Sequence, residues 1–254
     1  MNINVKAEEL ARIAQQVRLD TFKLAMEHKE KHIAPSLSSV EILVVLYEEI
    51  MKSEDKFILS KGHGCLSWYV VLRRKGFNPK IRAHPDIDPK NGIFCTTGSL
   101  GHGLPICVGM AFARKLKKQN GRIFVLIGDG ECQEGTTWES LNIAKRYCLD
   151  NLTIIVDYNK QQAIAKTCDV VGEDNLKEKF KAFGCHTLEV DGHNIIQLLE
   201  SLDEKRIIKT KPTTIIAHTI KGKGISFMEG QPEWHAKIPK TNNLIEQAYK
   251  ELRV

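Results

Sequence analysis

The stretch of sequence that decides the fold is residues 122–159, RIFVLIGDGECQEGTTWESLNIAKRYCLDNLTIIVDYN. An apolar run over 122–127 ends in a glycine-flanked acid, Asp129, and a second apolar run over 152–156 is soon followed by Asn159. A stretch with helical character separates the two runs. Consecutive parallel strands that are joined by one helix have their carboxyl ends side by side. We therefore expect Asp129 and Asn159 to converge at one edge of a parallel sheet.

The residues at this edge have the chemistry of a site for a divalent cation that carries a diphosphate. Open α/β sheets bind ligands at the carboxyl ends of their strands. A carboxylate and an amide oxygen suit Mg²⁺, which takes one or two protein oxygens together with phosphate oxygens. Gly128 and Gly130, which flank the acid, let a bulky anion approach the backbone. A glycine-flanked acid alone would more often be a strand-ending turn, and the downstream asparagine is what favours the metal site.

This arrangement resembles the thiamine-diphosphate motif, in which Gly-Asp-Gly is followed by an asparagine; here Asn159 stands 30 residues after Asp129. The residues between them also fit the transketolase version of the motif: Gln133, Glu134, Gly135, Trp138, Glu139, Ala144, Asn151 and Leu152. The resemblance to the N-terminal, diphosphate-binding half of transketolase covers nearly the whole chain. It implies thiamine diphosphate as the cofactor, bound through Mg²⁺ or through Ca²⁺ or Mn²⁺ in its place.

Histidines and glycine-rich loops supply further candidates for the site. A lone histidine in a loop is usually only solvated, but some of these histidines lie where the backbone can approach a ligand. Residues 60–64 read SKGHG, and residues 97–103 read TGSLGHG, which is either a tight turn with a helix cap or a cradle for an anion. Imidazoles that titrate near neutral pH suit proton transfer from sugar hydroxyls. The five histidines at glycine- or proline-rich turns are His32, His63, His84, His102 and His235.

The resemblance implies a role for each candidate. The catalytic residues that it implies are His32, His63, His84, His102, Glu134, Lys221 and His235. The cofactor contacts that it implies are His63, Gly98, Ser99, Leu100, Gly128, Asp129, Gly130, Glu131, Asn159, Gln161, Gln162, Lys221 and His235. The implied metal ligands are the side chains of Asp129 and Asn159 and the backbone carbonyl of Gln161, and Glu134 matches a glutamate at the family's subunit interface. Two positions depart from the family pattern: many members have glutamine in place of His102, and a glutamine follows the metal asparagine by three residues here, as Gln162.

Composition indicates one globular domain. The chain has 254 residues, of which 42% are hydrophobic and 27% charged, so it can bury a sizeable core. Its net charge of +6 fits a solvated lysine-rich surface or an anionic ligand, and no nucleic-acid-binding module is recognisable. Seven cysteines without a Cys-x-x-Cys pair argue against zinc or a disulfide framework and suit a reducing cytoplasm. We expect neither a secretory signal nor a membrane span.

The pattern of apolar residues predicts a doubly wound, mostly parallel sheet with helices on both faces, in a single domain over residues 1–254. The expected strands are 122–127, 152–156, 186–190 and 213–217. Residues 55–61 and 76–101 are expected to be loops. The expected helices are 6–30, 40–51, one that ends near residue 75, 105–119, 138–147, 176–183, 195–207 and 242–252.

Full-length transketolases are much longer than this chain, and their second half carries the pyrimidine-binding domain, with the glutamate that protonates the cofactor ring. No candidate for that domain follows residue 218. The resemblance therefore implies the N-terminal subunit of a split transketolase, active only with a separate pyrimidine-domain subunit. The expected reaction is transfer of a two-carbon ketol unit from a ketose phosphate to an aldose phosphate, as in the pentose phosphate pathway. The expected assembly is a cytoplasmic heterotetramer in which this chain self-associates through an apolar face.

Three other interpretations remain open on the sequence. The chain could belong to another thiamine-diphosphate enzyme, such as deoxyxylulose-phosphate synthase or the alpha subunit of a 2-oxo-acid dehydrogenase, although the histidines favour ketose chemistry. It could be a non-catalytic subunit that retains the fold. It could also be a doubly wound domain with an unknown ligand, because a fold alone does not specify a function.

Overall fold

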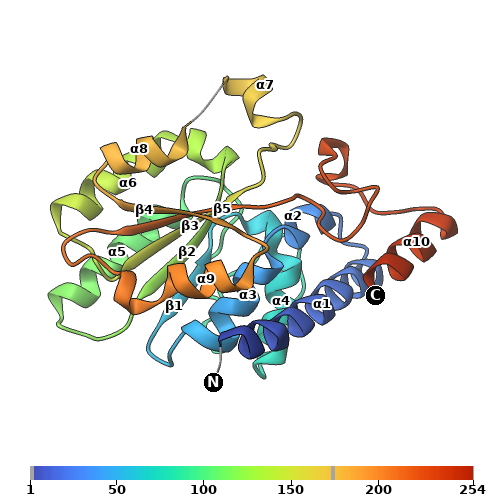
Figure 1. Cartoon of the computed structure of the whole chain (residues 1–254), viewed down its shortest axis with the longest axis horizontal. Coiled ribbons are helices and arrows are strands. Elements are labelled where there is room, and N and C mark those ends of the chain that lie inside the picture. The colour runs from blue at the N-terminus through green and yellow to red at the C-terminus, as the bar shows by residue number, and fades with distance from the viewer. Residues whose placement is uncertain (1–2, 173–174, 254) are drawn as a thin grey trace.

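The computed structural model describes residues 3–172 and 175–253 and is built on one sheet of five strands (Figure 1). The order of the strands is β1-β2-β3-β5-β4, and all neighbours pair in parallel. The doubly wound, mostly parallel sheet is thus confirmed. The strands are β1 (Lys56–Leu59), β2 (Ile123–Gly128), β3 (Leu152–Tyr158), β4 (His186–Asp191) and β5 (Thr213–His218).

Helices cover both faces of the sheet, and each face has its own apolar cluster (Figure 1). Successive side chains of a strand point to opposite faces. In β2, Phe124 and Leu126 pack on one side, whereas Val125 and Ile127 pack on the other. The first side is covered by α1 (Ile3–His28), α3 (Val40–Val45), α4 (Cys65–Arg74) and α9 (Ile195–Leu202), and the second by α5 (Gly103–Leu116), α6 (Gly135–Arg146) and α8 (Leu176–Ala182).

The handedness of the connections explains this division. Crossovers between parallel strands are right-handed in nearly all proteins. The chain moves in one direction across the sheet from β1 to β4, so α5, α6 and α8 lie on the same face. It then turns back from β4 to β5, and the same handedness places α9 on the opposite face.

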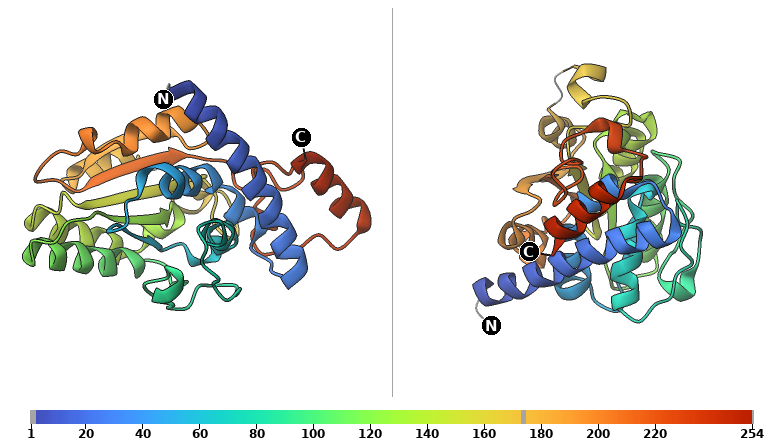
Figure 2. Two further views of the ribbon diagram at one scale, coloured as in Figure 1. Left: turned by 90° about the horizontal axis from the view of Figure 1, so that it is seen from below. Right: turned by 90° about the vertical axis from the view of Figure 1, so that its right-hand side faces the viewer.

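Helix caps and aromatic contacts fix the C-terminal part of the chain. The side chain of Asn194 accepts a hydrogen bond from the Gln197 N–H and caps α9. Thr241 caps α10 (Asn242–Leu252) in the same way, and the predicted bounds of this helix are confirmed. Helix α10 packs on α1, where the rings of Phe22 and Tyr249 meet edge to face, 5.0 Å between centroids. Figure 2 shows α10 at the end of the molecule toward which the strands point, beside the C-terminal part of α1.

Several elements differ from the sequence-based expectation. Residues 55–61 were expected to be a loop, but Lys56–Leu59 form β1, an edge strand too short to show a period-two pattern. Two short helices were not expected: α2 (Ile33–Leu37) and α7 (Thr167–Val171). Helix α9 ends at residue 202, not 207, because Asp203 caps a separate turn by accepting the Lys205 N–H.

Two further observations concern membranes and thiols. Within the described ranges, no helix combines the length and the apolarity that crossing a bilayer requires. All seven cysteines are free thiols, and four of them are buried. Burial raises the pKa of Cys65 and Cys185, to about 12 and about 11, so these thiols are unreactive near neutral pH.

Candidate active site

One cavity of about 400 Å³ lies at the carboxyl ends of the strands. Of the residues predicted for the site, all line this cavity except Ser99 and His102. The lining also includes residues that had not been assigned a role: Pro35, Lys61, Gln133 and Ala163. The predicted residues that line it are His32, His63, His84, Gly98, Leu100, Gly128, Asp129, Gly130, Glu131, Glu134, Asn159, Gln161, Gln162, Lys221 and His235.

The ends of β2 and β3 form an oxygen-rich half of the cavity. Gly128 and Asp157 are paired in register, so Asp129 and Asn159 follow neighbouring strands as expected. The buried carboxylate of Asp129 accepts hydrogen bonds from the Gly130 N–H (2.9 Å) and the Thr167 hydroxyl (3.1 Å). Burial, with the nearby Asp157 charge, raises the pKa of Asp129 to about 6. A buried carboxylate of this kind is stabilised in its charged form by a bound cation.

Beneath this half, Lys61 and Asp157 form a completely buried ion pair. Burial opposes ionisation of Asp157, but the Lys61 ammonium and two hydroxyls hold its pKa below the usual value. The hydroxyls belong to Ser38, whose Oγ lies 2.6 Å from Asp157 Oδ2, and to Thr219. Lys61 also donates to the Pro35 carbonyl at 2.9 Å. Sequence reasoning quoted Lys61 within SKGHG but gave it no role, because its partner lies 96 residues away.

Two glycine-rich loops approach each other closely at the cavity wall. A Cβ atom on Gly62 would lie 2.8 Å from the Gly98 nitrogen, so this backbone contact requires glycine. Gly98 itself has φ +138° and packs under the ring of His84. The buried carboxylate of Glu131 joins the loops by accepting from the Gly101 N–H (2.9 Å), the Gly128 N–H (3.2 Å) and the Ser60 hydroxyl.

Four imidazoles form the other half of the cavity. The ring centroid of His32 lies 5.5 Å from those of His84 and His235, and His63 lies 5.1 Å from His235. Burial, followed by nearby cationic groups, lowers the pKa of His32 to about 4 and of His235 to about 3. Burial lowers the pKa of His63 as well. These three rings are therefore neutral near pH 7, and the expectation that they titrate near neutral pH is wrong for the empty cavity because burial disfavours the charged form. Each neutral ring keeps one nitrogen that can accept a hydrogen bond.

Lys221 enters the cavity from the segment that follows β5. Its side chain is buried, and its Nζ donates to the Gln162 carbonyl at 2.9 Å. Burial and the neighbouring Lys61 ammonium lower the pKa of Lys221 to about 8. Two backbone hydrogen bonds hold this segment: Gly222 N–H to the Ala34 carbonyl and Gly230 N–H to the Lys221 carbonyl, both 3.0 Å.

The structure separates two predicted residues from the others. Ser99 is exposed, and His102 is an exposed residue at the start of α5 whose side chain caps no helix N–H. Glu134 and His84 line the cavity although both are exposed, which places them at its mouth. Thr167, by contrast, contacts Asp129 from α7, a helix that the sequence did not predict.

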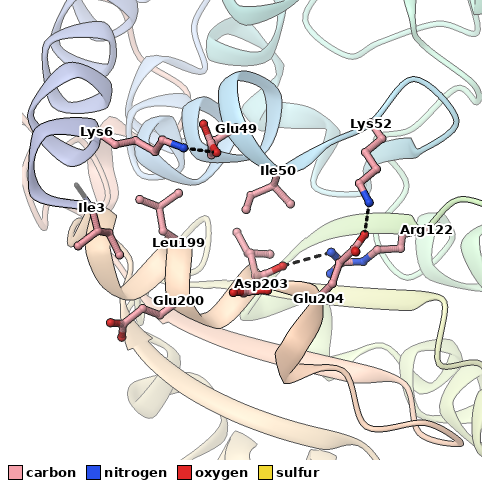
Figure 3. Close-up of a pocket in the computed structure, with 11 residues that line it drawn as sticks. Ile3, Lys6, Glu49, Ile50, Lys52, Arg122, Leu199, Glu200, Asp203 and Glu204 are labelled. Atoms are coloured by element: carbon pink, nitrogen blue, oxygen red, sulfur yellow. Dashed lines mark hydrogen bonds and ion pairs between the residues drawn. The ribbon is translucent and has the colours of Figure 1, made fainter. Parts of the chain in front are cut away.

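A second cavity of about 400 Å³ lies at the opposite, amino-terminal end of the sheet (Figure 3). Lys6 pairs there with Glu49, and Lys52 pairs with Glu204. Arg122 donates to the Leu202 carbonyl at 3.1 Å. Its lysines are paired with acids and Arg122 faces a backbone carbonyl, so this cavity presents no convergent set of groups for catalysis.

The residues of the carboxyl-end cavity fit a metal-bound diphosphate cofactor. Asp129 and Asn159 supply hard oxygen ligands, and Gly98 and Gly130 allow close backbone approach. Several polar atoms are buried here without a hydrogen-bond partner: His32 Nδ1, Gln161 Oε1, Gln162 Nε2 and His235 Nδ1. Buried polar groups normally have partners, so these atoms point to a polar ligand in this space.

Comparison with known proteins identifies the family of this chain. Residues 11–252 match the family described as transketolase, thiamine diphosphate binding domain. The chain is 38% identical over 272 residues to one subunit of the apulose-4-phosphate transketolase of Actinobacillus succinogenes, with 98% of each chain covered. It is 36% identical over 238 residues to the 6-deoxy-6-sulfo-D-fructose transketolase subunit SqwG of a Clostridium species, covering 84% of this chain and 86% of that one.

Full-length transketolases match over only part of their own length. Human transketolase is 32% identical over 268 residues, which are 97% of this chain but 42% of the human protein. The crystal structure of Campylobacter jejuni transketolase superposes with a TM-score of 0.83 at 27% identity and covers 100% of this chain and 43% of that one. The chain thus spans about two fifths of these longer relatives. Because the family match extends over nearly the whole sequence, the chain belongs to the transketolase family, in which it corresponds to the thiamine diphosphate binding domain.

Proposed function

We propose that this chain is the diphosphate-binding subunit of a split transketolase, which transfers a two-carbon ketol unit from a ketose to an aldose. One observation carries the proposal: a single cavity brings the side-chain oxygens of Asp129 and Asn159 together with a group of neutral imidazoles. The first half suits a metal-bound diphosphate, and the second suits a polyhydroxylated substrate. The family match favours this function over that of another thiamine-diphosphate enzyme.

The oxygen-rich half holds the cofactor. The side chains of Asp129 and Asn159 and the carbonyl of Gln161 bind Mg²⁺, for which Ca²⁺ or Mn²⁺ can substitute. Backbone groups at Gly98, Leu100 and Gly130 allow the cofactor to lie against the loops. When bound, thiamine diphosphate supplies the carbanion and the electron sink of the reaction.

The imidazole half moves protons and orients the sugar. His63 and His235 are neutral at pH 7, so each can accept a hydrogen bond from a substrate hydroxyl. Burial holds the pKa of both rings low in the empty cavity, so they are weak bases there, and an anionic cofactor beside them would raise their basicity. His32 Nδ1 and His235 Nδ1 are free to bond a substrate hydroxyl, and His84 contacts the sugar at the mouth of the cavity. The ammonium of Lys221 holds an anionic group of the cofactor or substrate.

The substrate is a ketose with an anionic end. Similar proteins are named for apulose-4-phosphate and for 6-deoxy-6-sulfo-D-fructose, and both names describe sugars with an anionic group. Of the two lysines in this cavity, Lys61 is already paired with Asp157. We infer that the partner subunit supplies most of the groups that bind the phosphate or sulfonate. Pentose phosphates remain candidate substrates.

The partner is a separate pyrimidine-domain subunit. The chain covers nearly the full length of a relative that is itself named as one transketolase subunit, and about two fifths of human transketolase. The name of that relative supports the proposal that a second polypeptide supplies the part that this chain does not match. We propose a heterotetramer in the cytoplasm, in which Glu134, at the mouth of the cavity, contacts a neighbouring subunit.

Reconstitution tests this function. Ketol transfer is measured with xylulose 5-phosphate, apulose 4-phosphate and 6-deoxy-6-sulfofructose as donors, using each of the two chains by itself, and both together with thiamine diphosphate and Mg²⁺. We expect turnover only when both chains are present. Robust turnover by this chain alone would contradict the split enzyme. A complex that binds the cofactor but transfers no ketol unit from any donor would instead indicate a non-catalytic subunit.

A further inference from the structure

A cluster of three polar side chains, those of an arginine, a glutamate and a histidine, lies outside the cavity and is largely buried. It consists of Arg18 on α1, Glu41 on α3 and His193 in the turn between β4 and α9. Their side chains are 4%, 12% and 13% exposed, and none of them lines the cavity. Burying charged groups is unfavourable unless each one is paired. We refer to these residues as the Arg18–Glu41–His193 cluster.

The carboxylate of Glu41 is at the centre of the cluster. One oxygen accepts from the Arg18 guanidinium, and the other lies 3.0 Å from His193 Nδ1. Burial opposes its ionisation, but His193 and Arg18 lower the pKa of Glu41 below the usual value. Glu41 is therefore a charged acceptor that fixes two side chains from distant parts of the sequence.

Each of those two side chains contacts the backbone next to Lys221. His193 Nε2 lies 2.9 Å from the Ile220 N–H. A backbone N–H can only donate, so Nε2 is the unprotonated nitrogen, and the proton of the neutral ring is on Nδ1, directed to Glu41. Arg18 Nη1 donates to the Lys223 carbonyl at 2.9 Å and to the Leu37 carbonyl at 2.7 Å.

The close contact with Arg18 also explains a glycine. Gly224 has φ +95°, and a Cβ there would lie 2.5 Å from Arg18 Cδ. A side chain at this position would strain the backbone and displace Arg18. The cluster is thus fitted to the backbone of residues 220–224, which has no regular secondary structure.

We propose that the Arg18–Glu41–His193 cluster is a positioning device that fixes the backbone on both sides of Lys221 and so places its ammonium in the cavity. The proposal rests on the function proposed above and extends it to residues that never touch the ligand. Outer-shell partners of this kind typically hold a functional group to within a fraction of an ångström.

Two substitutions of His193 separate positioning from general stability. The amide of asparagine occupies the place of Nδ1, so His193→Asn keeps a donor for Glu41 but cannot reach the Ile220 N–H. The amide of glutamine occupies the place of Nε2, so His193→Gln supplies an acceptor oxygen to that N–H. If the cluster positions Lys221, the placement of its ammonium is kept in His193→Gln and lost in His193→Asn.

The first measurement needs no catalytic activity. The purified full chain is treated with a lysine-acetylating reagent at one fixed pH, and modification of Lys221 is followed by mass spectrometry, with an exposed lysine such as Lys160 as the internal reference. Lys221 is 2% exposed, so it reacts slowly in the parent chain. We expect His193→Asn to raise its relative rate of modification about tenfold, the scale of an outer-shell loss, and His193→Gln to leave it near the parent value.

The second measurement is the affinity for inorganic pyrophosphate with Mg²⁺, by calorimetry, for His193→Asn, Lys221→Ala and the double variant. We expect His193→Asn to weaken binding about tenfold and to add nothing when Lys221 is already alanine. Equal losses of pyrophosphate affinity in His193→Asn and His193→Gln, in proportion to a lower melting temperature, would overturn the proposal. Additive losses of affinity in the double variant would also overturn it, and so would a rate of Lys221 modification in His193→Asn equal to that of the parent chain. If the parent chain binds no pyrophosphate, the assignment of a preformed diphosphate site to this chain fails, and the labelling experiment still decides the role of the cluster.

Discussion

At the scale of single residues, the proposed metal site depends on two oxygen ligands at neighbouring strand ends. We expect Asp129→Ala and Asn159→Ala each to weaken Mg²⁺-dependent binding of thiamine diphosphate by about 100-fold or more. Burial raises the pKa of Asp129 to about 6, which means that the charged carboxylate is unfavourable in the empty site. Asp129→Ala should therefore melt no lower than the parent chain. Calorimetry with and without Mg²⁺ measures the affinity.

Ser99 provides the matched control for this experiment. It belongs to the loop expected to contact the cofactor, but it is exposed and does not line the cavity. Ser99→Ala should bind thiamine diphosphate like the parent chain. Affinity within a few-fold of the parent value in Asp129→Ala would remove Asp129 from the metal site.

The imidazoles make stability depend on pH at the same scale. The pKa of His32 is lowered to about 4 and that of His235 to about 3, chiefly by burial. As the pH falls below the unfolded-state pKa of roughly 6.5, the unfolded chain binds protons that the folded chain does not, so the free energy of unfolding decreases. Above that pH both the folded and the unfolded chain hold these histidines neutral, so the free energy of unfolding no longer depends on their titration.

A double variant isolates this effect from other titrations. Between pH 7 and pH 5, His32→Gln/His235→Gln should lose less stability than the parent chain, by roughly 3 kcal/mol, because each histidine accounts for roughly 2 kcal/mol and solvent screening of the partly buried rings reduces the sum. Urea unfolding at several pH values measures the difference. Stability curves that stay parallel for the two proteins over this range would show that neither histidine is held neutral by burial.

At the scale of elements, α5 can pack against the end of β1 only because its first residue is a glycine. Gly103 and Gly135 are the first residues of α5 and α6. A Cβ on Gly103 would lie 2.2 Å from Ser60 Oγ and 2.8 Å from Ser60 Cα, whereas a Cβ on Gly135 would meet nothing within 4 Å. We expect Gly103→Ala to lower the free energy of unfolding by about 1–3 kcal/mol through overpacking. Gly135→Ala, the same change at the same helix position, should alter it by less than about 1 kcal/mol, and equal effects in denaturant unfolding would contradict the assigned contact.

Elements also show where a sequence pattern fails. Four of the five strands were predicted to within one or two residues, because they are apolar runs with clear ends. The strand β1 has only four residues and was taken for a loop, and it is a strand because its backbone pairs with β2. The short helix α7 was missed for a similar reason, since Thr167 is fixed by its contact with Asp129 and not by local propensity.

At the scale of the whole molecule, the two neighbouring helices α5 and α6 expose large apolar side chains. Ile106 and Leu116 on α5 are 41% and 71% exposed, and Ile143 on α6 and Tyr147 directly after it are 48% and 45% exposed. The sequence led us to expect an apolar face for self-association, and this surface is our candidate for it. Self-association itself stays a prediction.

Sedimentation analysis tests this surface. We expect the isolated chain to dimerise and the double variant Ile106→Glu/Ile143→Glu to sediment as a monomer, because a buried charge without a partner opposes association. Val5→Glu on α1, which replaces an equally exposed apolar residue (52%), should leave the dimer intact. Dissociation by Val5→Glu but not by the double variant would place the contact elsewhere.

The sequence by itself determined the parallel sheet and the oxygen-rich half of the site. A motif of glycine, aspartate and asparagine at strand ends has few structural solutions, because parallel connections bring those ends together. It also pointed to the four histidines that line the cavity, since glycine- and proline-rich loops are where binding residues are often found. For His102 and Ser99 the same pattern gave no information on orientation, and neither of them lines the cavity.

Only the tertiary structure decided which distant charges meet. Lys61 pairs with Asp157, and Arg18 and His193 meet at Glu41, although each pair is separated by an element or more in the sequence. Local sequence propensity does not predict such long-range contacts. A buried charge is unfavourable unless it is paired, and the packing of helices and strands decides which partner lies within reach. The strand order β1-β2-β3-β5-β4, which brings these groups together, is a property of the whole sheet.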